Sequence, residues 1–465
     1  MSKKKPILVA FTAILLLASL ALSQAGEPGM PGGEDYVRLF PNDGNCVYPA
    51  QGLLHRWPNG GPRELWRFRI GEGKAAIVEA GGRAFTGYQA DGKQWAACLD
   101  PSTGRILWTR MLIAKENHHG VEGMVSTPII DGNHVYFIPY DSNKGNLWDP
   151  HCPIFCLNAS DGAVIWEERE RFTATEGGLP LIVGNILYIG SSGKDNVLVA
   201  VDKLSGKLLW KVRDDTGANY CFQTGCSLSY AEFCGVPQIV CCVYQNDYIG
   251  VNARTGEILW HWSFPKSPFS GPVATPVVLG NRMFVSAFQS GVSWGACVEF
   301  KVEDGKTSAR TVYISDKLMC NAYHTPSVYA GAVYGFGRGS KSDALQCIDL
   351  ESGKLLWQQE GPEWSRQGNM MVADGLIFAT TKHDELVLAE AGKSGYKELG
   401  RVNPGIKLGL PQQPTIFGNR LYLRGNDTIV CYQADSHAKR TPEGTSAKKA
   451  VQKEPVKPKQ VGEPN

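Results

Sequence analysis

The stretch that decides the fold is residues 201–210, VDKLSGKLLW. It indicates a strand that ends in Asp, a turn that closes on Gly206, and a returning strand that reaches Trp210. The same ten-residue pattern returns as LDPSTGRILW, LNASDGAVIW, VNARTGEILW and IDLESGKLLW. A pattern that recurs at a regular interval along the whole chain indicates a repeat fold.

Three weaker copies extend the series. PRELW keeps only the returning strand and ends at Trp66, whereas VEDGKTSA and EAGKSGY put Ala309 and Tyr396 where the clear copies have Trp. A second element precedes the copies: a short apolar strand, a Gly-containing turn and another strand, as in TPIIDGNHVYFI from Thr127 and TPVVLGNRMFVS from Thr275. The two elements together make units of about 46 residues with four strands, the size of a propeller blade.

The sequence therefore predicts an all-β fold, an eight-bladed β-propeller of four-stranded antiparallel blades over residues 63–434. ELWRFRI, from Glu64, is a returning strand without a blade, and the last unit before Ala434 has three strands and no returning strand. We expect the N-terminal strand to pair with the C-terminal blade, because closing the ring in this way covers the strand edges.

Segments of different composition flank the predicted ring. Residues 1–25 have three Lys, a sixteen-residue apolar run and small residues up to Ala25, typical of a signal peptide. An uncleaved anchor is the alternative, although about 20 apolar residues are usual for a membrane span. Residues 26–62 form a leader segment, and residues 435–465 form a basic, Pro- and Lys-rich tail that we expect to be disordered.

Charge limits the partners. The basic residues in excess lie in the signal and the tail, so residues 26–434 are slightly acidic and have no basic stripe. A nucleic-acid binder needs such a stripe, and we expect none here. We predict an exported monomer in the periplasm or cell envelope, or secreted, that contacts membrane only through an uncleaved signal or the tail.

On the D-x-x-[ST]-G-x-x-x-W and TP-strand-GN-strand elements, residues 57–434 resemble the quinoprotein-alcohol-dehydrogenase-like eight-bladed propellers, whose repeats are described as pyrroloquinoline-quinone-like (PQQ-like). That family includes quinone dehydrogenases, a noncatalytic propeller that helps assemble outer-membrane β-barrels, and exported propellers without known activity. The resemblance implies a noncatalytic binding or scaffold module in the envelope. The alternative it implies is a PQQ- and calcium-dependent dehydrogenase of an alcohol or sugar.

The dehydrogenase alternative needs a catalytic Asp base and a calcium site built from Glu, Asn and Asp oxygens. We cannot match these residue by residue, so we predict no catalytic residue, no metal site and no cofactor. The repeat Trp residues are predicted to dock on neighbouring blades, each burying about 150–250 Å²; stacking on a cofactor is the alternative. They are Trp66, Trp108, Trp166, Trp210, Trp260 and Trp357.

The cysteines divide into two groups. Cys98, Cys156 and Cys347 each lie six residues before a repeat Gly, a position that takes small residues in other copies, so we expect free core thiols. Cys221 and Cys226 are a possible disulfide, and no paired CxxC spacing indicates zinc.

Loops that differ between units predict the ligand face. The Gly-containing turns are short and alike, so the variable loops share the opposite face, where binding is usual. We expect an envelope protein, a polysaccharide or a small ligand there. The candidate ligand-face residues are His118, His119, Glu122, Arg213, Asp214, Trp364 and Arg366.

Overall fold

The computed structural model describes fifteen stretches of the chain: residues 37–115, 123–141, 151–170, 178–193, 196–213, 227–243, 247–264, 274–289, 292–303, 306–316, 318–321, 324–361, 363–365, 367–408 and 412–435. The predicted signal peptide, and the predicted tail after Asp435, lie outside these stretches. The described residues contain strands and turns without any helix. They accordingly contain no helix that is long and apolar enough to cross a bilayer.

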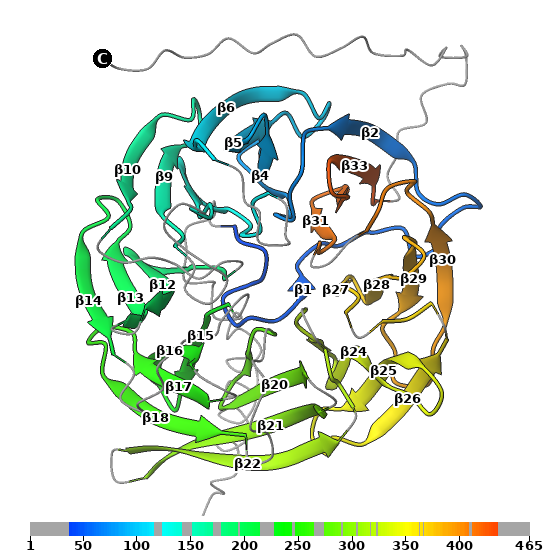
Figure 1. Cartoon of the computed structure of the whole chain (residues 1–465). Helices are drawn as coiled ribbons and strands as arrows, with labels where there is room; N and C mark the ends of the chain where they lie inside the picture. Colours follow the sequence, from blue (N-terminus) through cyan, green and yellow to red (C-terminus); the bar gives the residue numbers. More distant parts are fainter. Residues whose placement is uncertain are drawn as a thin grey trace, which may run out of the picture.

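Eight antiparallel sheets stand around a central axis as the blades of a propeller (Figure 1), which confirms the predicted fold. In each blade the first strand is innermost and the fourth is outermost. Blades 1 to 4 consist of β3 (Val78–Ala80), β4 (Arg83–Ala90), β5 (Lys93–Leu99), β6 (Ile106–Ile113); β7 (Ile129–Asp131), β8 (His134–Phe137), β9 (Ile154–Asn158), β10 (Val164–Glu168); β11 (Leu181–Val183), β12 (Ile186–Gly193), β13 (Asn196–Asp202), β14 (Leu208–Val212); and β15 (Ser229–Phe233), β16 (Val236–Cys242), β17 (Asp247–Asn252), β18 (Ile258–Ser263).

Blades 5 to 8 consist of β19 (Val277–Leu279), β20 (Arg282–Gln289), β21 (Val292–Glu303), β22 (Lys306–Asp316); β23 (Ser327–Tyr329), β24 (Ala332–Arg338), β25 (Asp343–Asp349), β26 (Leu355–Glu360); β27 (Met370–Ala373), β28 (Leu376–Thr380), β29 (Leu386–Glu390), β30 (Glu398–Val402); and β31 (Thr415–Phe417), β32 (Arg420–Arg424), β33 (Thr428–Gln433), β2 (Glu64–Arg69). Turns between the first and second strands, and between the third and fourth, lie at one end of every blade. We call that end of the ring the short-turn face.

The ring closes in blade 8 as the sequence predicts. Strand β2 pairs antiparallel with β33, with Trp66 opposite Cys431, so the chain's first long strand is the outer strand of its last blade. Segments from the two ends of the propeller therefore share one sheet (Figure 1).

The repeat Trp residues join neighbouring blades. Trp108 of blade 1 donates from its indole Nε1 to the carbonyl oxygen of Ala159 in blade 2, at 3.0 Å. Its ring lies over Gly162, where an added Cβ would come within 2.7 Å of the indole. The turn needs a positive φ, 73° at Gly162, and the indole needs the missing side chain, so both demands select Gly. Trp66, Trp166 and Trp210 lie in the same way over Gly104, Gly206 and Gly256.

In blade 4 the indole Nε1 of Trp260 donates to Gln238 Oε1 of its own blade at 2.7 Å, and its ring lies 4.6 Å from that of Phe300 in blade 5. In blade 5 the strands β21 and β22 extend well beyond the usual strand length. Ala309, predicted at the Trp position, is wrong: Tyr313 pairs with Cys297 there, as Trp108 pairs with Cys98 in blade 1. Its hydroxyl donates to the carbonyl oxygen of Leu350 at 2.8 Å. Because the hairpin is longer, the residue opposite Cys297 comes later in the outer strand. A repeat pattern of fixed length therefore predicts the wrong residue at this position.

Blade 7 shows a second correction. Tyr396 is not at the Trp position, because Gly400 pairs with Leu388 there. Trp57, from the predicted leader segment, fills this position. A Cβ added at Gly400 would come within 2.7 Å of the Cβ of Trp57, and the Trp57 ring lies 6.1 Å from the Phe378 ring at an interplanar angle of 54°. Trp108 meets Phe85 at the same 54° angle, so the leader supplies the Trp that this blade lacks.

The three predicted core thiols, Cys98, Cys156 and Cys347, are free and fully buried. Desolvation is the main reason that the pKa of each rises to about 12. These thiols stay protonated at neutral pH, which suits a packing role. The possible Cys221–Cys226 disulfide lies outside the described residues.

Replacing Trp108 tests the contact between blades. We expect Trp108→Ala to lower the free energy of unfolding by about 3–5 kcal/mol, because the indole ring and its hydrogen bond are both lost. Leu107→Ala is the matched control, because that neighbouring side chain is 44% exposed, and it should stay within about 0.5 kcal/mol of the wild type. Urea unfolding followed by circular dichroism measures both, and equal midpoints would contradict the docking role.

Replacing Trp57 tests whether the leader belongs to the ring. Trp57 is 6% exposed, and we expect Trp57→Ala to cost about 3–5 kcal/mol, as for a repeat Trp. Arg56→Ala, at an exposed neighbour, should change stability by less than about 0.5 kcal/mol. Thermal unfolding of the two variants distinguishes these outcomes; a neutral Trp57→Ala would mean that the segment is only a linker.

Candidate functional site

Residues 37–57 form the N-terminal segment: residues 37–48 run around the axis along the inner strands, and residues 49–57 lead outward to bonds with Ala434 of blade 8 and Leu399 of blade 7 (Figure 1). Val37 bridges Ile130 of blade 2, and β1 (Val47–Tyr48) pairs parallel with β27 of blade 7. Between these points the segment accepts a hydrogen bond from one backbone amide of each of five inner strands. The bonds run from Ile130 to Val37 O, Tyr230 to Asn42 O, Val278 to Asp43 O, Val328 to Asn45 Oδ1 and Val372 to Cys46 O, at 2.7–3.0 Å.

The sequence of the segment suits this path. Gly44 has a φ of 77°, and a Cβ there would clash with the carbonyl oxygen of Pro276 in blade 5. Asn45 uses its amide group twice, since Nδ2 also donates to Val328 O at 2.9 Å. Arg38 donates from Nη2 to Leu228 O at 3.0 Å. Glycine and amide side chains thus let an extended chain follow a tight curve inside the ring.

Among the described residues the segment makes no backbone hydrogen bond to the inner strands of blades 8 and 1, although Ile416 of blade 8 is 2% exposed and lies in one core cluster with Leu39, Phe40 and Tyr48. Phe417 and Arg420 close the hairpin between β31 and β32, so the next pair, Ile416 and Leu421, turns the Ile416 backbone groups toward the axis. Within the described residues, neither the Ile416 amide of β31 nor the equivalent Glu79 amide of β3 has an acceptor of the kind that the five other strands have.

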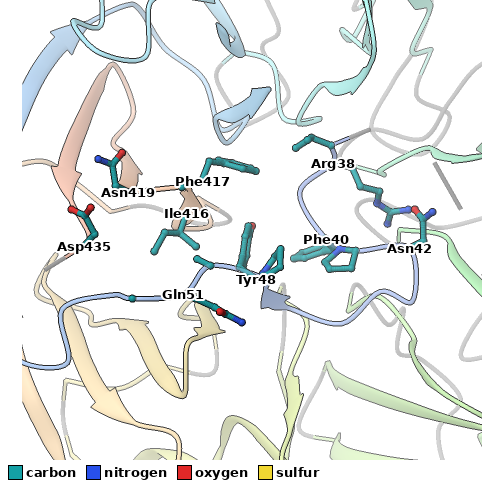
Figure 2. A pocket seen from close by; sticks show the side chains of 15 residues that line it. Arg38, Phe40, Asn42, Tyr48, Gln51, Ile416, Phe417, Asn419 and Asp435 are labelled. Carbon is teal, nitrogen blue, oxygen red and sulfur yellow. The ribbon is translucent and has the colours of Figure 1, made fainter. Parts of the chain in front are cut away.

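A pocket of about 410 Å³ lies between the N-terminal segment and blade 8 (Figure 2). We call it the axial pocket. Its walls are mainly apolar: Tyr48 and Phe417 meet edge to face at 6.0 Å, and Phe40 and Ile416 lie beside them. It opens at the short-turn face, where its lining includes Pro49, Ala50, Gln51, Gly418, Asn419 and Asp435.

Ionisable groups near the pocket are hydrogen-bonded within the protein, and burial raises the pKa of two of them. The Tyr48 hydroxyl donates to Leu39 O at 2.6 Å, and burial raises the pKa of Tyr48 well above its usual value. Burial also raises the pKa of the Asp43 carboxyl, an effect that Arg38 opposes. The pocket therefore suits an apolar group better than a polyanion.

The apolar lining of the axial pocket can be compared with the two cofactors that the dehydrogenase alternative needs. PQQ is polyanionic, and calcium takes six to eight oxygen ligands. The described residues hold no group of three or more His, Cys, Asp or Glu side chains that could bind a metal ion. The axial pocket does not fit PQQ with calcium, and we derive no chemical step through them.

Most predicted ligand-face residues lie outside the described part of the chain: His118, His119, Glu122, Asp214 and Arg366. Arg213 is described and exposed, directly after β14. The prediction of a ligand site on the variable-loop face therefore stays a prediction. The axial pocket, which sequence reasoning missed, lies at the other face.

Trp364 is a correction, because it is fully buried and offers no surface to a ligand. Its ring packs against Phe336 at 6.0 Å and against Tyr396 at 6.3 Å, in the core between blades 6 and 7. His324 contacts the same Phe336 edge to face, at 5.1 Å. Neither ring nitrogen of His324 has a partner among the described residues, and desolvation lowers its pKa to about 3.

Comparisons with known proteins agree with the fold. Residues 57–210 and 151–359 match the model of a family described as outer membrane protein assembly factor BamB. The chain belongs to this family. The predicted resemblance to PQQ-like propellers is thereby confirmed, since the BamB family model is one of the PQQ-like repeat models.

Similar structures and relatives are distant. BamB from Moraxella catarrhalis has a TM-score of 0.56 and 14% identity, covering 81% of this chain and 98% of that chain, which shows the fold alone. A quinohemoprotein alcohol dehydrogenase from Comamonas testosteroni has a TM-score of 0.43 and 12% identity, over 89% of this chain and 82% of that chain. A tetrathionate hydrolase from Acidithiobacillus ferrooxidans is 24% identical over 371 residues, 72% of this BamB-family chain and 68% of that protein.

His324 gives a prediction about pH. Its folded-state pKa of about 3 lies below the usual value of about 6.5, so between these values the unfolded chain binds the proton more readily and stability falls as pH falls. At pH 4.5 this residue alone should cost about 2–3 kcal/mol relative to pH 7.5.

His324→Leu should remove that part of the pH dependence, measured as urea midpoints between pH 7.5 and pH 4.5. His383→Leu is the matched control, because His383 is exposed, and it should keep the wild-type slope. A His324→Leu variant that is as acid-sensitive as the wild type would contradict the assignment of a neutral buried imidazole.

Proposed function

We propose that this protein is a noncatalytic binding and scaffold module of the cell envelope that holds a protein partner at the axial pocket. The observation that carries the proposal is the pocket itself: about 410 Å³, mainly apolar, and open at the short-turn face. Specific pockets typically have volumes of about 300–1,000 Å³, mostly apolar walls and a few polar groups. The axial pocket has these properties, with Gln51, Asn419 and Asp435 among its polar lining.

Family membership supports a location in the cell envelope and a protein as the partner. The matched family is described as an outer membrane protein assembly factor, and that name implies an exported protein that contacts other proteins. The export signal predicted over residues 1–25 agrees with this location.

Site-specific photo-crosslinking in cells tests the proposal. A photo-reactive amino acid at Gln51, an exposed residue of the pocket, should crosslink to one discrete envelope protein. The same amino acid at Ser205, exposed in a short turn of blade 3, should not. The partner, identified by mass spectrometry and purified, should bind the wild type and lose affinity about tenfold or more for Ala50→Trp, which fills the pocket.

An enzyme assay covers the competing function. Purified protein is incubated with PQQ and calcium and supplied with alcohols, sugars and a redox dye. We expect no bound chromophore and no dye reduction. Substrate-dependent dye reduction would overturn the noncatalytic proposal, and loss of the Gln51 crosslink with a folded protein would overturn the axial pocket as its site.

A further inference from the structure

We infer that residues 49–52 form a movable flap, which closes over an apolar side chain of the partner once that side chain has entered the axial pocket. This inference rests on the proposed function and adds to it how the site receives the partner. The four residues line the pocket on the side of the N-terminal segment, across from the hairpin that joins β31 and β32 in blade 8 (Figure 2). We call them the flap.

Both ends of the flap are fixed. At one end Tyr48 is buried and pairs with Ala373 of β27 in blade 7. At the other end Leu53 is buried, its amide donates to Asp374 Oδ2 at 2.9 Å, and its backbone bridges Asp435 beside blade 8. Movement is therefore limited to the residues between these two anchors.

The flap itself has few contacts. Pro49 lacks an amide hydrogen and so ends the ladder between β1 and β27. In the described part of the chain no backbone hydrogen bond involves Pro49, Ala50 or Gln51. Gly52 has a φ of 71°, and a Cβ there would have nothing within 4 Å. Only Ala50 packs partly against the core, whereas the other three residues are exposed. A segment with so few bonds and so little buried surface moves at a low cost in free energy.

The opposite wall of the pocket is fixed. Phe417 pairs with Arg420 in the hairpin of blade 8, and its ring meets that of Tyr48 edge to face at 6.0 Å. Ile416, next to it, is buried in the core cluster. Because only the flap wall has few bonds, its position sets the width of the pocket. Closing over an apolar side chain removes further apolar surface from water, which favours the closed position when the pocket is filled.

Double electron–electron resonance on the full chain measures the flap directly. One spin-labelled unnatural amino acid replaces Gln51 in the flap, and the reference label replaces Asn185 in an exposed short turn of blade 3. In the matched control pair the first label replaces Asn419, which is exposed on the fixed wall. In the free protein we expect a wider distance distribution for the pair with Gln51 than for the pair with Asn419.

A defined probe then fills the pocket. The probe is N-acetyl-phenylalaninamide, a neutral molecule with one apolar side chain, and N-acetyl-alaninamide is the matched molecule without the ring. We expect saturable binding of the phenylalanine probe, an affinity about tenfold or more lower for the alanine molecule, and narrowing of the Gln51 distribution by the phenylalanine probe alone. The Asn419 distribution should stay unchanged.

Two glycine variants test the backbone of the flap. Gly52 and Gly184 have φ values of 71° and 59°, and an added Cβ has nothing within 4 Å at either position. Alanine therefore strains both backbones alike without a clash. Gly52→Ala should weaken the phenylalanine probe about threefold or more, whereas Gly184→Ala should bind it like the wild type and lower the thermal midpoint by the same amount as Gly52→Ala.

Three results would overturn the inference. They are a Gln51 distribution as narrow as that of Asn419 in the free protein, a Gln51 distribution that the bound probe leaves unchanged, and no saturable binding of the phenylalanine probe. Equal probe affinity of Gly52→Ala and Gly184→Ala would overturn Gly52 as the hinge of the flap.

The outcome separates this inference from the proposed function. If Gln51 crosslinks to an envelope protein but the flap is as fixed as the opposite wall, the flap inference fails and the binding function stands. If the flap closes on the probe and no partner is captured at Gln51, the flap stands and the scaffold function fails.

Discussion

The constraint on which the centre of this molecule depends is the pairing of backbone amides at the axis. Each inner strand of a propeller has one sheet neighbour, so its other edge points into the ring, where an unpaired buried amide costs free energy. Here the chain's own N-terminal segment accepts one backbone amide from each of five inner strands, from Ile130 to Val372. Among the described residues β31 and β3 make no such bond, and the axial pocket lies between the segment and blade 8.

A second kind of contact holds the blades side by side. An outer-strand indole or phenol lies against the following blade's turn, and a Gly there leaves room for the ring, as Trp108 and Gly162 show. The contact is retained where the repeat fails: Tyr313 serves blade 5, and Trp57 serves blade 7 from outside the repeat. The N-terminal segment therefore contributes to both the axis and the periphery, and its ends lie at the candidate site and in a blade.

The repeat was sufficient to predict the ring, its blade number and its closure, because those features follow from local patterns that recur. Turn glycines and the Asp-to-Trp spacing depend on neighbouring residues, and the unmatched strand ELWRFRI required a partner at the other end of the chain. The positions of Ala309 and Tyr396 were wrong because strand length varies and because Trp57 replaces a repeat residue from a distance. The site was not predictable in this way, since residues 37–57 do not repeat and their partners lie on seven different blades.

The most direct test of the axial binding site is residue-resolved amide hydrogen exchange, measured on the free protein and on its complex with the partner. The amides of Val278 and Val372, bonded to the N-terminal segment, should exchange slowly with and without the partner, whereas the amides of Gln51 and Asn419, which line the axial pocket, should become protected when the partner binds. Amides of Gln51 and Asn419 that exchange equally fast in the free protein and in the complex would contradict the axial pocket as the binding site.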